Sequence, residues 1–297
     1  MPRLPRARPT PGCAMQPLPA AAAHGRLAAG KAIAKAPLQT RRRRRGGTKG
    51  SKGAARADEA ASGRPGAAGG GGKSGTAGGS FQMSAYLRSY KGLGDYHLDI
   101  FRGVAGLILA HQTTKAPSAI SVVYPGCHRH ISASLVFPSV TYIDCDSRVT
   151  PLFSDPKALS FIETHKEYPQ DSDIRALTKS FDAKLSLPDA SFDLLISASA
   201  GIVTKSCTRY VRKGGFLLVS DAHYDARMAH TMKEWDLKAV YHMDKKAFDS
   251  DVEGHFQLKG GGSVTEKHVQ ESIDQPSKQK RSFKLREEAL FYAFQRT

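Results

Sequence analysis

Two apolar runs joined by a Pro-Gly turn constrain the fold of this chain more than any other feature. The first run covers residues 119–124 and meets Pro125 and Gly126, and the second run ends at Asp144 after a short amphipathic segment. This order predicts a strand, a turn, a helix and a second strand. Asp144 lies 18 residues beyond Gly126, close to the spacing at which an acid holds a ribose in a nucleotide-binding βαβ unit. We therefore expect a ligand over this turn.

Charge is distributed unevenly along the 297 residues. The first 80 residues contain 16 lysines and arginines against two acids, a net charge of +14, whereas residues 81–297 carry only +3 of the total of +17. The first segment is rich in Ala, Gly, Pro and Arg, so it cannot bury enough apolar surface to offset its loss of conformational entropy. We expect a disordered tail over residues 1–80 and one folded α/β domain over residues 81–297.

Several interpretations of the tail compete. Few acids with abundant Arg and Ala are typical of an organellar transit peptide, which would direct the protein to a plastid or mitochondrion. The run Arg41–Arg45 could instead be a nuclear-localisation signal or a nucleic-acid-binding arm. Translation could also begin near Met83. The glycine-rich segment 69–75 is not a phosphate loop, because Ala67 stands where the first glycine is required.

Apolar runs and cysteines limit the class of protein. No apolar run approaches the roughly 18 residues that span a bilayer, and no signal-peptide core is visible. The four cysteines show no CxxC pair. We expect an intracellular protein with reduced thiols, organellar or otherwise cytoplasmic, with no membrane partner. A nucleic-acid partner is expected only through the tail, because the rest of the chain is nearly neutral.

Apolar runs of strand length alternate with helical patterns along the rest of the chain. Expected strands cover residues 120–124, 140–144, 173–178, 192–197, 216–220, 235–243 and 289–295, and expected helices cover residues 95–110, 151–165 and 202–211. This alternation predicts a Rossmann-like, mostly parallel seven-stranded sheet with helices on both faces. No clear crossover helix joins the last two strands, which predicts an antiparallel hairpin at one edge.

Three blocks resemble class I S-adenosylmethionine-dependent methyltransferases, over about residues 93–297. Residues 187–197 (LPDASFDLLIS) look like the family's fourth-strand segment, residues 207–221 (CTRYVRKGGFLLVSD) like its fifth, and residues 140–146 (VTYIDCD) like its second. The chain also looks like a divergent subgroup in which the first strand ends in YPG. The resemblance implies methyl transfer from S-adenosylmethionine to a small-molecule acceptor.

The first motif departs from the family pattern. Aligned on Gly126, the residues Tyr124, His128 and His130 stand where the family has an acid and two glycines. Glycines at such a turn let the backbone approach a ligand and adopt positive φ. The histidines favour an alternative, a non-catalytic Rossmann-like binding or scaffold protein that kept the sheet and lost the glycines.

Five positions are candidates for binding the cofactor. Gly126 would be the pivot of the ligand turn, and Asp144 would accept hydrogen bonds from the ribose diol. The resemblance places Phe181 on the adenine ring and Asp182 on its amino group. It places Ser197, at the end of the fourth strand, where acceptor and methyl group meet. The alternative for Gly126 is a plain tight turn, and the alternative for Asp182 is an ordinary surface turn. Asp144 and Ser197 could instead cap the helices that follow them.

His223 is the candidate general base. It lies just beyond the fifth strand between two aspartates, whose negative charges could raise its pKa. The alternative is a surface loop. Cys127, His128 and His130 offer soft and imidazole ligands at one turn, but no firm further ligand completes the set, so we predict no metal site.

Overall fold

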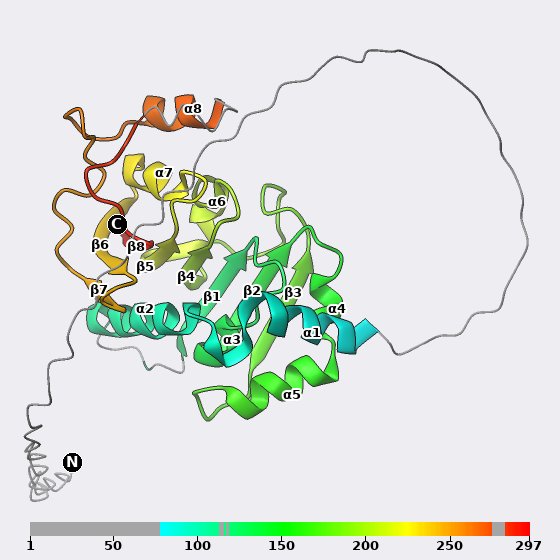
Figure 1. Ribbon diagram of the computed structural model, residues 1–297. Coiled ribbons are helices and arrows are strands. Elements are labelled where there is room, and N and C mark those ends of the chain that lie inside the picture. Colours follow the sequence, from blue (N-terminus) through cyan, green and yellow to red (C-terminus); the bar gives the residue numbers. More distant parts are fainter. Residues whose placement is uncertain (1–77, 113–115, 117–118, 275–282) are drawn as a thin grey trace, which may run out of the picture. The chain divides into compact units, whose positions relative to one another are not determined.

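An eight-stranded sheet with the order β3-β2-β1-β4-β5-β8-β6-β7 is the centre of the molecule (Figure 1). The computed structural model describes residues 78–112, 116, 119–274 and 283–297, all within one compact unit. Residues 1–77 lie outside the described residues, so the disorder, targeting and nucleic-acid interpretations of the tail stay predictions. No helix in the described part of the chain is long and apolar enough to cross a membrane.

Strands and helices alternate along the chain. The strands are β1 (Ser121–Pro125), β2 (Ser139–Asp144), β3 (Asp173–Thr178), β4 (Phe192–Ser197), β5 (Val211–Val219), β6 (Trp235–His242), β7 (Ala247–Asp249) and β8 (Phe291–Arg296). The helices are α1 (Gly78–Tyr90), α2 (His97–His111), α3 (Ala133–Val136), α4 (Val149–Phe153), α5 (Pro156–His165), α6 (Val203–Cys207), α7 (Asp225–Thr231) and α8 (Glu266–Asp274). Short 3-10 turns cover Gly92–Gly94 and Thr208–Tyr210.

The first five strands are parallel, and their order reverses at β1. Strand β1 pairs with β2 on one side and with β4 on the other, while β3 and β5 extend the two halves. Open α/β sheets bind ligands at this kind of switch point, in the crevice beyond the carboxyl ends of the strands. The sequence prediction of a Rossmann-like α/β fold is confirmed.

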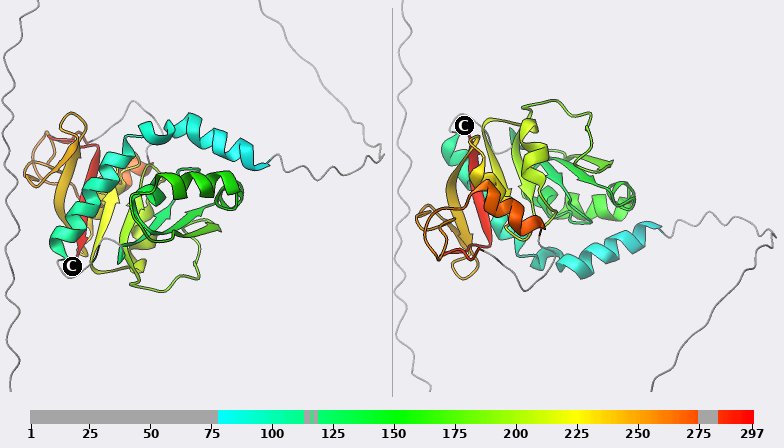
Figure 2. Two further views of the ribbon diagram at one scale, coloured as in Figure 1. Left: turned by 90° about the horizontal axis from the view of Figure 1, so that it is seen from below. Right: turned by 90° about the horizontal axis from the view of Figure 1, so that it is seen from above.

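Alternating side chains of the central strands pack into two hydrophobic clusters, one on each face of the sheet. Val122 and Tyr124 belong to the cluster under α1 to α5, whereas Val123 belongs to the cluster under α6, α7 and α8. Successive side chains of a strand point to opposite faces, so continuous apolar strands need cover on both. Figure 2 shows α1 and α2, in cyan and blue-green, running along one side of the sheet.

The antiparallel part of the sheet differs from the prediction. The described residues form eight strands instead of the predicted seven, because the short β7 pairs with β6 and makes the edge hairpin. The last strand, β8, is not at the edge, since it lies antiparallel between β5 and β6. This placement buries Phe291, Tyr292 and Phe294, which are at most 2 % exposed. Burial of these rings, rather than a local turn signal, determines the position of β8.

Two expected helices are shorter than the sequence predicts. The expected helix over residues 151–165 is split into α4 and α5, because Asp155 accepts a hydrogen bond from the Lys157 N–H and Pro156 begins the new helix. The Arg212-Lys213-Gly214-Gly215 segment lies inside β5 and does not end a helix. The helices α1, α7 and α8 were not predicted.

Candidate functional site

The turn after β1 packs directly against the loop after β4. Gly126 has a φ of 64°, and a Cβ added to it would lie 2.0 Å from the Ala200 Cβ. Only glycine tolerates this combination of positive φ and close approach. The close backbone approach at Gly126 therefore brings two loops of the protein together at the switch point.

Asp144 organises the same turn from the end of β2. One carboxylate oxygen accepts a hydrogen bond from the His128 N–H at 2.7 Å, and the other accepts one from the Asp146 N–H at 2.9 Å. An ionised carboxylate has about four acceptor positions, so about two are left for a ligand. His128 has a φ of 49°, so the backbone reaches the left-handed region here without a glycine.

The remaining predicted cofactor residues have different surroundings. The Phe181 ring is half-buried, and its Cζ lies 3.7 Å from a Cβ built on Gly201 in the loop after β4. Asp182 is exposed and accepts a hydrogen bond from the Ser206 hydroxyl at 2.8 Å. The Ser197 hydroxyl is buried and donates to Asp225 at 2.6 Å. The structure gives Ser197 a partner in the core in place of an exposed position.

A cavity of about 670 Å³ opens beside these loops, at the carboxyl ends of β4 and β5. We call it the His97 cavity; its wall includes Tyr96, His97, Ser199, Ser220, Tyr224 and Phe291. This volume is within the range of small-molecule sites. Ser199 lines the cavity while the next residue, Ala200, meets Gly126, so one loop borders both the cavity and the switch point.

Two residues of the cavity wall have strained backbones. Ser199 has a φ of 62° and Tyr224 a φ of 65°. Residues other than glycine pay about 1–3 kcal/mol for such conformations, which cluster at functional sites. His223 precedes Tyr224 but is exposed and is not among the residues that line the cavity. The structure therefore places the predicted base outside this cavity.

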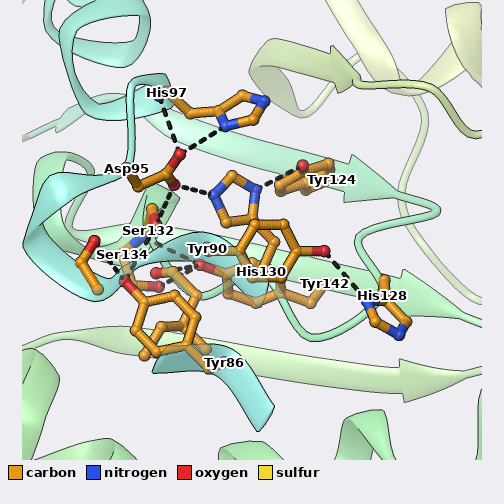
Figure 3. Close-up of polar contacts among 12 residues, drawn as sticks. Tyr86, Tyr90, Asp95, His97, Tyr124, His128, His130, Ser132, Ser134 and Tyr142 are labelled. Atoms are coloured by element: carbon orange, nitrogen blue, oxygen red, sulfur yellow. Dashed lines mark hydrogen bonds and ion pairs between the residues drawn. The ribbon is translucent and has the colours of Figure 1, made fainter. Parts of the chain in front are cut away.

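His97 belongs to a buried hydrogen-bond network centred on Asp95 (Figure 3). The Asp95 carboxylate accepts from His97 Nδ1 at 2.7 Å, from the His97 N–H at 3.1 Å, from His130 Nε2 at 2.5 Å and from the Ser132 hydroxyl at 2.7 Å. These four donors fill the acceptor positions of the carboxylate. The Tyr124 hydroxyl lies 2.9 Å from His130 Nδ1 and completes the chain of contacts.

The network fixes the proton positions on both rings. Burial acts to raise the pKa of Asp95, but the hydrogen bonds from His130 and His97 outweigh it and hold the pKa well below its usual range. Because the ionised Asp95 carboxylate only accepts hydrogen bonds, His97 donates to it through Nδ1, and Nε2 is the ring nitrogen that makes no contact with Asp95. Burial lowers the pKa of His130, so His130 is neutral, with its proton on Nε2 toward Asp95.

Among the described residues, the side chains of Asp95, His97 and His130 form a group whose ligand atoms could surround a metal ion. Their ligand atoms lie within 4.8 Å of one another. This group differs from the Cys127, His128 and His130 set considered from the sequence. The distances of 2.5 and 2.7 Å between Asp95 and the two rings are those of hydrogen bonds. The arrangement suits an oriented histidine base.

The sheet order decides the fold assignment. Five parallel strands lie in the order 3-2-1-4-5, and an antiparallel strand lies beside the fifth. The fold is a Rossmann-like α/β fold.

No family model matches the chain, and no curated protein matches it. A solved protein from Corynebacterium glutamicum is similar over 57 % of this chain and 86 % of its own, with 11 % identity and a TM-score of 0.37. The YcgJ protein from Bacillus subtilis is similar over 65 % and 94 %, with 13 % identity and a TM-score of 0.32.

A third similar structure is geranyl diphosphate C-methyltransferase from Streptomyces coelicolor A3(2), solved with Mg²⁺, geranyl diphosphate and S-adenosyl-L-homocysteine. The alignment has 13 % identity and a TM-score of 0.28, and it covers 39 % of this chain. It spans only 43 % of the length of that enzyme, and 42 % of another geranyl diphosphate methyltransferase solved with sinefungin.

Sequence reasoning missed Asp95 and His97, the polar centre beside this cavity. The local signal was an aspartate and a histidine two residues apart, at the beginning of α2. Its partner His130 is distant in sequence and was assigned to the ligand turn. Only the packing of α2 and the Gly126 turn against the same strands brings these groups together.

Proposed function

We propose that this protein is an S-adenosylmethionine-dependent methyltransferase whose acceptor binds in the His97 cavity. The observation that supports this most is the position of His97, an oriented base in a cavity that shares one loop with the switch point. Asp144 and Gly126 border that switch point on its other side. A methyl donor and an acceptor would therefore meet at the loop that carries Ser199 and Ala200.

The residues at the switch point fit the nucleoside half of the cofactor. Asp144 keeps acceptor positions for two ribose hydroxyls beyond its two backbone donors. Phe181 and Asp182 follow β3 at the same edge, where the ring of one and the carboxylate of the other would contact adenine. When bound, S-adenosylmethionine supplies a methyl group on a sulfonium and leaves as the neutral thioether.

His97 would act on the acceptor. Its Nε2 would take the proton of an acceptor hydroxyl while the oxygen receives the methyl group, and Asp95 would stabilise the imidazolium that forms. A positioned general base contributes about 10²- to 10⁴-fold in rate. The cavity wall would hold the acceptor oxygen in line with the transferred methyl group, which reduces the entropic part of the barrier.

Isothermal titration of the full chain with S-adenosylmethionine and S-adenosylhomocysteine tests the proposal. We expect micromolar binding that is lost in Asp144→Ala and retained in Asp173→Ala, a control that removes an exposed carboxylate at the start of β3. Absence of heat with both ligands, on protein shown to be folded by circular dichroism, would contradict the proposal.

One observation favours a second function, a Rossmann-like binding or scaffold protein without transferase activity. The Gly126 turn packs against Ala200. The space beside this glycine, which a cofactor would occupy in a glycine-rich turn, is therefore filled by the protein itself. This alternative predicts a folded chain that binds neither cofactor form. The titration therefore separates the two.

A further inference from the structure

Charge in the wall of the His97 cavity is unbalanced. Six ionised side chains line it, and four of them are cations: Arg227, Lys259, Lys284, Arg286, Asp221 and Glu288. Arg227 uses both acids, because its Nε lies 2.7 Å from Asp221 and its Nη2 lies 3.9 Å from Glu288. The other three cations have no acidic partner among the described residues.

The three unpartnered cations come from two adjacent segments. Leu258 pairs with Leu285 in an antiparallel bridge, and the Lys259 N–H donates to the Lys284 carbonyl at 2.9 Å. Both leucines are buried. Lys259 follows Leu258, and Lys284 and Arg286 flank Leu285, so the three exposed cations lie close together at this bridge. Like charges directly opposite each other on a ladder are destabilising.

Such a cluster is stabilised when an anion lies among its members, since each cation then gains an opposite charge. The adjoining wall is aromatic: Tyr96, Tyr224, Phe283, Phe291 and Tyr292 all line the same cavity. The cavity therefore combines a flat apolar surface, a cationic rim and the His97 base.

We propose that the acceptor is a small hydroxylated aromatic acid, whose acidic group is held by Lys259, Lys284 and Arg286. This inference rests on the proposed function for the methyl transfer, but the recognition itself needs no cofactor. Its aromatic body would pack on the rings of the wall, and its hydroxyl would reach His97. A neutral molecule of the same shape would leave the three cations unpaired.

Equilibrium binding of two probes to the full chain tests this recognition. The probes are 4-hydroxybenzoate and its neutral isostere 4-hydroxybenzamide, titrated without cofactor in low salt. We expect at least tenfold tighter binding of the acid, and we expect added salt to reduce this preference because the rim is exposed. Equal affinities, or no binding of either probe, would overturn the proposal.

The basic residues 1–80 also attract anions, so two triple variants test whether the preference for the acid arises in the cavity. Lys259→Gln/Lys284→Gln/Arg286→Gln should lose the preference for the acid. Lys157→Gln/Lys233→Gln/Lys246→Gln removes three exposed cations that do not line the cavity and should keep it. A preference that survives in the first variant would overturn the proposal. Failure of the proposed cofactor binding would instead appear as absence of heat when the wild-type chain is titrated with S-adenosylmethionine and S-adenosylhomocysteine, and it would leave this result unchanged.

Discussion

At the scale of single residues, Asp95 determines the chemistry of the cavity. Its carboxylate is 2 % exposed and would be costly to bury alone, but four donors surround it. The ionised state that these donors stabilise fixes the tautomer of His97. A buried carboxylate that orients a histidine leaves the second ring nitrogen free to accept a proton.

We expect His97→Gln to reduce methyl transfer about 10²- to 10⁴-fold, because the base is removed while the cavity keeps its shape. The loss should appear in kcat, and the affinity for S-adenosylhomocysteine should stay the same. Steady-state kinetics with an acceptor that the wild type methylates provide the measurement. His223→Gln is the matched control, and an equal loss in that variant would argue against His97 as the base.

We expect Gly126→Ala to lower the free energy of unfolding by at least about 2 kcal/mol, through the contact with Ala200 and the positive φ. Urea unfolding measures this change. The double variant Gly126→Ala/Ala200→Gly should recover the part caused by the contact and retain about 1 kcal/mol of backbone strain. Additive effects of the two substitutions would show that the residues do not interact.

At the scale of elements, Asp225 connects three of them beyond the carboxyl end of β4. It begins α7, accepts from the Ser197 hydroxyl at the end of β4, and accepts from the Thr204 N–H in α6 at 3.1 Å. Burial raises its pKa to about 6, although the hydrogen bonds from Ser197 and Thr204 act against this rise. These contacts hold the helices of one face on the sheet.

This raised pKa gives a pH dependence with a defined sign. Asp225 contributes most stability below its ordinary pKa of 3.8, and that contribution is lost as the pH rises through about 6. The stability difference between the wild type and Asp225→Asn should therefore move by up to about 3 kcal/mol in favour of the variant from pH 4 to pH 8. Urea unfolding across this range measures it, with exposed Asp171→Asn as a control that should show no such trend.

At the scale of the whole molecule, positive charge is concentrated at one end of the chain. Residues 1–80 carry +14, and residues 81–297 carry +3. A strongly basic segment attracts polyanions regardless of sequence, through release of counterions. The folded domain, with nearly equal numbers of both signs, has no such general attraction.

We expect the full chain to bind duplex DNA weakly and without sequence preference in low salt, with affinity that falls steeply as salt increases. Replacing Arg41–Arg45 by glutamine should make the salt dependence shallower. The Lys157, Lys233 and Lys246 triple variant should leave it nearly unchanged. Fluorescence anisotropy over a salt series measures both slopes. Strong binding at physiological salt would contradict this expectation and support a nucleic-acid function.

The sequence by itself determined the parallel half of the sheet and the strand ends at the switch point. Short apolar runs such as residues 194–196 in β4 predict buried strands because both faces of a parallel sheet are covered. The position of Asp144 followed from the same local pattern. These features depend on residues close together in the chain, where periodicity and turn chemistry carry the information.

Only the tertiary structure decided the position of β8 and the chemistry of the cavity. Strand β8 pairs with β5 and β6 inside the sheet, and there its rings are buried in the hydrophobic clusters on both faces. Asp95 and His97 meet His130 because α2 and the Gly126 turn pack on the same strands. Burial and hydrogen bonding between distant segments set these contacts, and no local pattern encodes such partners.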